Sequence, residues 1–161
     1  MLTMAIVDIE RLHKQQSRVR EIRNLQSEIE IISSKLSSPG SVKLTDMPKN
    51  QTPFDKVGMW ISTKIQKETR MNKLIAEAVS EGKILEEVIE SISNLPEPTQ
   101  GASNSFYQDL LRYHYLNDIE MKEILYFIGV EGDADNYDSK LRLLYQRRYE
   151  ALKKFIKCQK N

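Results

Sequence analysis

The chain has a single cysteine, Cys158, which excludes an internal disulfide and a cysteine-based zinc site. Its two histidines, His13 and His114, lie far apart, and neither has the spacing of a metal-ligating motif. The six glycines are scattered singly, so the glycine-rich motifs that bind phosphates or position a nucleophile are missing. We therefore predict no metal, no cofactor and no catalytic residues, and we expect that the chain is not an enzyme.

Long hydrophobic runs are missing as well. The longest apolar stretches, such as residues 124–130, fall far short of the roughly 20 residues that a membrane-spanning helix needs. The first residues, MLTMAIVDIERLHK, have neither a cationic region before the apolar patch nor a small-residue cleavage site, so no secretory signal is expected. These features predict a cytoplasmic chain without a membrane partner.

What the chain does contain is charge combined with moderate hydrophobicity. Charged residues make up 29% and apolar residues 40% of its 161 positions. This composition, with few glycines, is typical of helical proteins, and the length suits one ordinary domain or two small ones. We therefore predict an all-α fold.

A stripe of apolar residues at intervals of three, four and seven positions runs through the first part of the chain and predicts an amphipathic helix. The stripe comprises Ile9, Leu12, Val19, Ile22, Leu25, Ile29, Ile32 and Leu36. The sequence SSPG ends this helix, and residues 37–53 are predicted to form a polar linker containing Pro48 and Pro53.

A second long helix is predicted to begin at Thr52 and Pro53, because threonine caps helices and proline favours the first helical position. Its apolar residues follow an interrupted heptad pattern. One row comprises Ile61, Glu68, Ile75, Gly82 and Ile89, and the other comprises Lys64, Met71, Ala78, Leu85 and Ile92.

Two long amphipathic helices joined by a short linker fit an antiparallel helical hairpin, here a coiled-coil arm over residues 1–95. A lone hairpin buries little apolar surface, so we expect a homodimer through these N-terminal helices. The alternative is that the helices fold back onto the C-terminal domain.

A second linker is predicted over residues 96–104, which contain two prolines and a glycine. Helices are expected over residues 105–116 and 119–128, with Gly129 in the position of a left-handed cap. A basic helix follows. This order is that of a helix-turn-helix unit over residues 105–161, in which the last helix enters the major groove of DNA.

Charge is sorted along this C-terminal region. Residues 109–138 contain eight acidic side chains and two basic ones, whereas residues 139–161 contain eight basic side chains and one acidic one, Glu150. On a helical wheel the last helix has an apolar arc of Leu141, Leu144, Tyr145, Ala151, Leu152, Phe155 and Ile156, with the stem of Arg148. The opposite, outward arc holds Lys140, Arg142, Gln146, Arg147, Lys153, Lys154 and Lys157, with Leu143 and Glu150 among them.

The remaining features of the region have structural interpretations. The aromatic side chains are better explained by a small packed core than by base stacking. The acidic stretch that starts at Asp133 lacks the glycine and the closing glutamate of a calcium-binding loop, so no such site is predicted. We expect Asp138 or Ser139 to cap the basic helix.

Three stretches resemble the phage late-gene transcription regulators of the RinA/ArpU type, whose C-terminal part is similar to region four of bacterial sigma factors. They are LTDMPKNQTPFDKVG at residues 44–58, YHYLNDIEMKEILYFIGV at residues 113–130 and LLYQRRYEALKKF at residues 143–155. Together they cover most of the chain in order. The chain departs from the family at Leu125, at Asp118 and in an apparent acidic insertion at residues 130–138.

The resemblance implies a sigma region four-like C-terminal domain that binds promoter DNA and activates phage late genes in a host bacterial cell, with host RNA polymerase as a further partner. The basic helix would then read double-stranded DNA. We predict base contacts from Arg142, Gln146 and Arg147, with Leu143 against a thymine methyl group, and phosphate contacts from Lys140, Lys153, Lys154 and Lys157. The alternative is a helical interaction module that binds RNA polymerase or another regulator without specific DNA binding.

Overall fold

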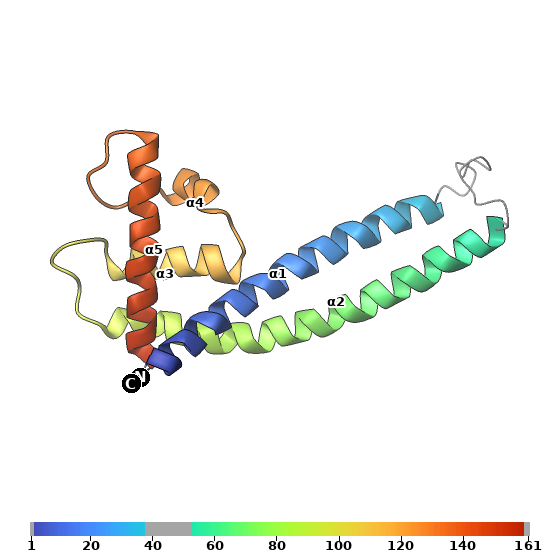
Figure 1. Cartoon of the computed structure of the whole chain (residues 1–161), viewed down its shortest axis with the longest axis horizontal. Helices are drawn as coiled ribbons and strands as arrows, with labels where there is room; N and C mark the ends of the chain where they lie inside the picture. The colour runs from blue at the N-terminus through green and yellow to red at the C-terminus, as the bar shows by residue number, and fades with distance from the viewer. Residues whose placement is uncertain (1, 38–52, 160–161) are drawn as a thin grey trace. The chain divides into compact units, whose positions relative to one another are not determined.

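The computed structural model describes residues 2–37 and 53–159, and every regular element in these ranges is helical (Figure 1). Five α-helices and two short helical segments follow one another along the chain. They are α1 (Leu2–Ser37), α2 (Pro53–Glu90), the 3₁₀ segment η3 (Ser91–Asn94), α3 (Asn104–Leu111), the π-helical segment η4 (Arg112–Leu116), α4 (Met121–Ile128) and α5 (Tyr137–Gln159). The prediction of an all-α fold is confirmed. Most of the linker predicted over residues 37–53 lies outside the described residues.

Several of the helix boundaries have a local chemical cause. Pro53 is the first residue of α2, where its missing amide donor costs nothing. Ser103 caps α3, because its hydroxyl accepts a hydrogen bond from the Phe106 amide at 3.2 Å. Gly129 ends α4 with a φ of 70°, which a residue with a side chain adopts only at a cost.

The cap of α5 differs from the prediction. The side chain of Asn136, and not that of Asp138 or Ser139, stands before the first turn and accepts a hydrogen bond from the Ser139 amide at 2.9 Å. The helix accordingly begins at Tyr137, three residues earlier than a Ser139 cap requires. Asparagine, aspartate and serine all serve as caps, so composition alone did not choose between them.

The chain divides into two compact units. The first comprises residues 1–19 and 78–161, and the second comprises residues 20–77. The division therefore cuts through α1 and α2 and not through the predicted linker at residues 96–104. The first part of α1 and the last part of α2 belong to the same unit as the C-terminal helices.

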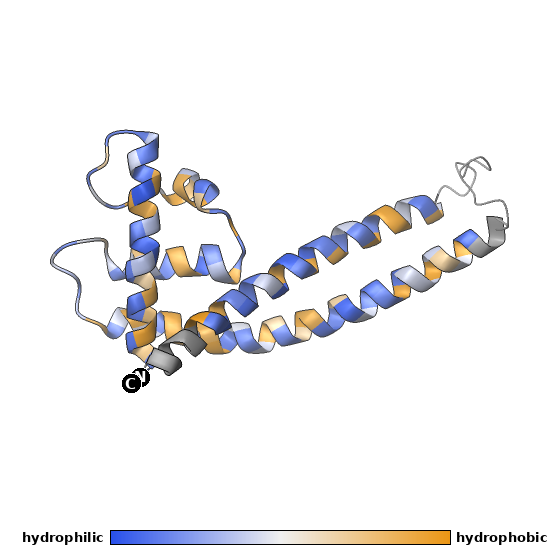
Figure 2. Cartoon of the chain, viewed as in Figure 1, coloured by the Kyte–Doolittle hydropathy of each residue, from blue (hydrophilic) through white to orange (hydrophobic). Residues whose placement is uncertain are grey.

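The core of the first unit explains this division. Its fully buried side chains include Leu12 from α1 and Leu85 and Ile89 from α2, together with Phe155 from α5. Further members of the core are Ile92, Ala102, Phe106, Tyr107, Leu110, Leu111, Tyr115, Met121, Ile124, Leu125, Leu144 and Ala151. At these ends, therefore, the long helices do pack with the C-terminal domain. Figure 2 shows how apolar segments alternate with polar ones along every helix.

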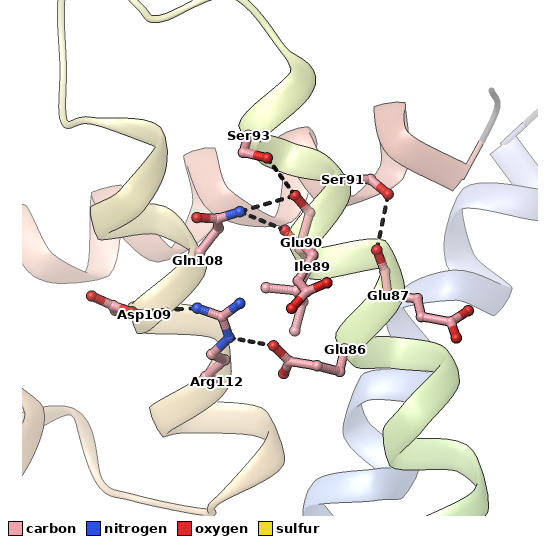
Figure 3. A network of polar contacts seen from close by, with 9 residues as sticks. All are labelled: Glu86, Glu87, Ile89, Glu90, Ser91, Ser93, Gln108, Asp109 and Arg112. Carbon is pink, nitrogen blue, oxygen red and sulfur yellow. Dashed lines mark hydrogen bonds and ion pairs between the residues drawn. The ribbon is translucent and has the colours of Figure 1, made fainter.

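Polar contacts join the end of α2 to α3 and to the start of η4 (Figure 3). The Arg112 guanidinium donates to the Glu86 carboxylate at 2.6 Å, and the Gln108 amide donates to the carbonyl oxygens of Ile89 and Glu90 at 3.0 and 3.1 Å. The Gln108 side chain thereby supplies a donor to two carbonyl oxygens where α2 passes into the 3₁₀ segment η3.

In the second unit α1 and α2 run antiparallel and are joined by ion pairs. Arg70 donates to Glu21 at 2.6 Å, and Lys67 pairs with Glu28. Among the residues of this unit whose side chains the structure describes, the buried apolar ones are Leu25 and Leu74. The predicted heptad row that placed Ile75 inward is wrong here, because Leu74, one residue earlier, is 7% exposed and Ile75 is 39% exposed.

Candidate nucleic-acid interface on α5

Helix α5 packs one face against α3 and α4 and turns another to solvent. Leu144, Ala151 and Phe155 on the packed face are completely buried. They follow one another at intervals of seven and four residues, which keeps them on one side of the helix. The apolar arc predicted from the sequence is therefore confirmed for these three side chains, but Tyr145 is 43% exposed and does not belong to it.

Arg147 does not lie on the outward face of α5, so the placement predicted for it from the helical wheel is wrong. The side chain is buried, with 8% exposed. Its Nε donates to the main-chain oxygen of Glu131 at 3.0 Å, and its Nη1 donates to the Glu150 carboxylate at 2.9 Å. Although burial opposes the charge, the hydrogen bond and the negative charge of Glu150 raise the pKa of Arg147 above its usual value. The residue ties α5 to the loop before it.

Glu150 is the centre of this network. Its carboxylate accepts a hydrogen bond from the Tyr107 hydroxyl as well as from Arg147. Burial raises the pKa of Glu150, but these hydrogen bonds and the Arg147 charge outweigh burial, so the pKa lies below its usual value. Burial and the hydrogen bond to Glu150 raise the pKa of Tyr107. The only acid of the basic segment thus serves packing between α5 and α3.

Lys154 is also engaged within the fold. Its ammonium group donates to the Asn104 side-chain oxygen at 2.6 Å and lies 5.3 Å from the centre of the Tyr107 ring. These contacts place Lys154 on the flank of α5 that faces α3, and not among the exposed lysines of the helix. Leu143 is half-buried, and its Cδ2 would lie 2.8 Å from a Cβ added at Gly132. Leu143, Arg147, Glu150 and Lys154 form one flank of α5 that faces its own domain.

The other predicted contacts are accessible. Arg142, Gln146, Lys153 and Lys157 are exposed along α5, and Lys140 is exposed in its first turns. Tyr145, which the helical wheel placed on the apolar arc, and Tyr149 lie among them, with 43% and 61% exposed. We call the set Arg142, Tyr145, Gln146, Tyr149, Lys153 and Lys157 the outward face of α5. A sequence signal could have placed Tyr149 on this face. It lies three residues after Gln146 and four before Lys153, and Arg142 lies four before Gln146, so the four side chains share one side of the helix.

Both tyrosines are paired with cations. The Arg148 guanidinium carbon lies 5.0 Å from the centre of the Tyr145 ring, and the Lys153 nitrogen lies 4.6 Å from the centre of the Tyr149 ring. Distances of this size are those of cation–π contacts. The outward face therefore alternates aromatic rings with positive charges.

Hydrogen bonds to Ser103 hold one end of the acidic loop before α5. The Glu131 carboxylate accepts hydrogen bonds from the Ser103 amide at 2.7 Å and the Ser103 hydroxyl at 3.0 Å. Asp133 and Asp135 in this loop are exposed, as is Asp138 in the first turn of α5. Among the described residues no three histidine, cysteine or acidic side chains gather as a metal ion would require.

Within the described ranges no helix is long and apolar enough to cross a membrane. Comparison with protein-family models, curated proteins and solved structures finds no match to this chain.

Proposed function

We propose that the chain is a phage-type transcription regulator, an activator of late genes, that binds double-stranded promoter DNA through a sigma-like helix-turn-helix formed by α3, α4 and α5. The observation that carries the proposal is the outward face of α5, where Arg142, Gln146, Lys153 and Lys157 are accessible together. Arginine and lysine can neutralise phosphates, and arginine and glutamine can pair with guanine and adenine edges in the major groove. The resemblance to the RinA/ArpU regulators favours the same function.

The burial of Arg147 and the bonding of Lys154 change the proposed contact set. Arg142 and Gln146 are proposed to contact bases, and Lys140, Lys153 and Lys157 are proposed to contact phosphates. Leu143 is left out because it is half-buried. The acidic loop at residues 130–138 repels phosphates, so it restricts the orientations in which α5 can approach a duplex.

Further parts of this proposal concern partners. The resemblance to the RinA/ArpU regulators makes host RNA polymerase a proposed partner of this chain. We propose a homodimer because the second unit exposes large apolar side chains. Between 45% and 57% of the surface of Ile31, Met59, Ile61 and Ile65 is exposed. A monomer seldom leaves so many large apolar side chains in water along two neighbouring helices.

The test is selection of duplexes from a random pool by the full chain, followed by binding of a selected and a scrambled duplex at low and high salt. A DNA-binding regulator prefers the selected duplex at both salt concentrations, because base contacts survive screening better than phosphate contacts do. Enrichment of no sequence, with binding that high salt abolishes for every duplex, would refute specific recognition.

A second candidate is an interaction module that holds RNA polymerase or another regulator without specific DNA binding. It is favoured by α4, where Tyr126 is 87% and Phe127 is 64% exposed. Beside them a pocket of about 510 Å³ is lined by Tyr126, Tyr137, Lys122 and Lys140, among others. Exposed aromatic side chains next to a hollow are typical of protein-binding surfaces. The duplex selection described above separates the two candidates.

A further inference from the structure

Two aromatic side chains on α5 do not contribute to the core. In the first unit Tyr107, Tyr115 and Phe155 are no more than 2% exposed, as expected for rings that stabilise a small domain. Tyr145 and Tyr149 are 43% and 61% exposed. Their rings therefore need an explanation other than packing within the fold.

These rings lie in a positively charged surrounding. The positively charged side chains of Arg148 and Lys153 lie 5.0 and 4.6 Å from the ring centres of Tyr145 and Tyr149. Arg142 and Lys157 add charge on the same face. The acid of this segment, Glu150, is occupied by Arg147 and Tyr107 and does not offset the cations of the outward face. The partner of such a surface is a polyanion with flat, apolar groups.

From these observations we infer that Tyr145 and Tyr149 bind unpaired nucleobases of DNA, so that the outward face of α5 prefers a locally opened duplex to a fully paired one. This inference rests on the proposed function, because it concerns the same face and the same ligand class. In a paired duplex the faces of the bases are covered by their neighbours and only their edges reach the groove. An unpaired base offers its π-face to a tyrosine ring.

The spacing of the two tyrosines suits this role. Residues four apart on a helix are separated by about 6 Å along its axis. The backbone of an unpaired strand is flexible, so the spacing of its bases can adjust to this distance. A strand running along α5 could therefore place two of its bases on Tyr145 and Tyr149 while its phosphates meet Lys153 and Lys157.

The experiment compares the affinities of the full chain for a duplex, for the same duplex with a central run of mismatched bases, and for the single strand, by anisotropy of a labelled DNA. We expect the mismatched duplex to bind more tightly than the paired one. Tyr149→Ala should weaken binding to the mismatched duplex and the single strand by roughly 5- to 100-fold, since each stacked base contributes on that scale. It should leave binding to the paired duplex within a few-fold.

Two further variants make the result specific. Tyr149→Phe keeps the ring and should bind as the original protein does, whereas Tyr126→Ala removes a still more exposed tyrosine from α4 and should change nothing. Thermal unfolding of each variant checks that the domain is intact. Equal affinity for paired and mismatched duplexes would overturn the inference and leave duplex recognition standing. Absence of binding to all three DNAs would overturn the inference and the proposed function together.

Discussion

The Arg147 guanidinium lies against the Glu150 carboxylate, with Nη1 2.9 Å from Oε2, on the flank of α5 that faces its own domain. Arg147 is 8% exposed, and its Nε also bonds the main-chain oxygen of Glu131. The sequence pattern places Arg147 on the outward side of α5. In the structure its side chain instead bonds α5 to the loop that precedes it.

Replacing Arg147 should therefore reduce stability. Arg147→Ala leaves Glu150 without its cationic partner and the Glu131 carbonyl without a donor, and hydrogen bonds to charged groups contribute about 1.5 to 3 kcal/mol each. We expect the free energy of unfolding to fall by about 2 kcal/mol or more, as measured by urea denaturation. The control is Arg142→Ala, an exposed arginine on the same helix, with an expected change within about 0.5 kcal/mol. Equal stability of both variants would contradict the structural role of Arg147.

Replacing Arg142 and replacing Lys157 should affect DNA binding in different ways. If Arg142 pairs with a base, Arg142→Ala loses about 1 to 3 kcal/mol of preference for the selected duplex and binds selected and scrambled DNA more equally. Lys157→Ala should weaken binding to all duplexes alike and reduce the salt slope by about one unit, as expected for one lost phosphate contact. Titrations over a range of salt concentrations measure both quantities. Unchanged sequence preference in Arg142→Ala would remove that residue from the reading face.

Stability should depend on pH through His114. Its Nδ1 lies 2.9 Å from the Ile119 main-chain oxygen, and its Nε2 faces Arg148 at 3.4 Å. Burial and the Arg148 charge lower the pKa of His114. The unfolded chain therefore takes up a proton more readily, and stability falls as the pH decreases below about 6.5 towards the folded-state pKa.

His114→Asn retains a side-chain donor for the Ile119 oxygen but cannot be protonated. Urea midpoints of this variant should change less between neutral and mildly acidic pH than those of the original protein. If the urea midpoints of the original protein and of the variant fall equally between neutral and mildly acidic pH, then His114 does not set the pH dependence.

Two glycines should respond in opposite ways to alanine. Gly132, in the loop before α5, has a φ of 134°, and an added Cβ would lie 2.8 Å from Leu143 Cδ2 and 2.9 Å from Arg147 Nη2. Gly132→Ala should cost roughly 1 to 3 kcal/mol. Gly58, inside α2, has no atom within 4 Å of an added Cβ, so Gly58→Ala should gain about 0.5 to 1 kcal/mol. Chemical denaturation of the pair measures both signs, and a tolerant Gly132 would mean that the loop can rearrange.

Self-association should depend on the apolar side chains of the second unit. Ile65 is 56% exposed on α2, so Ile65→Glu should change the stability of a monomer little but should weaken a dimer formed through this face. Gln66→Glu introduces the same charge at the neighbouring, exposed position and serves as the control. Sedimentation velocity at several concentrations follows the association. A chain that is monomeric at every concentration would refute the dimer.

The limits of sequence reasoning are visible in α5. Its helical character and its packed apolar side follow from residues repeating at intervals of three and four, which are local properties. The same repeat produces two polar stripes side by side, one with Arg142, Gln146 and Lys153 and the other with Arg147 and Lys154. Periodicity does not distinguish a stripe that meets water from one that meets a neighbouring polar group.

By itself the sequence determined the all-α fold, the start of α2 at Pro53, the glycine that ends α4 and the concentration of positive charge in the last helix. These depend on backbone geometry and on residues close together along the chain. Only the tertiary structure decided that Arg147 and Lys154 turn inward and that Tyr145 and Tyr149 turn outward. The partners that hold the inward pair, Glu131 and Asn104, come from other elements, and distant contacts of this kind leave no periodic signal in the sequence.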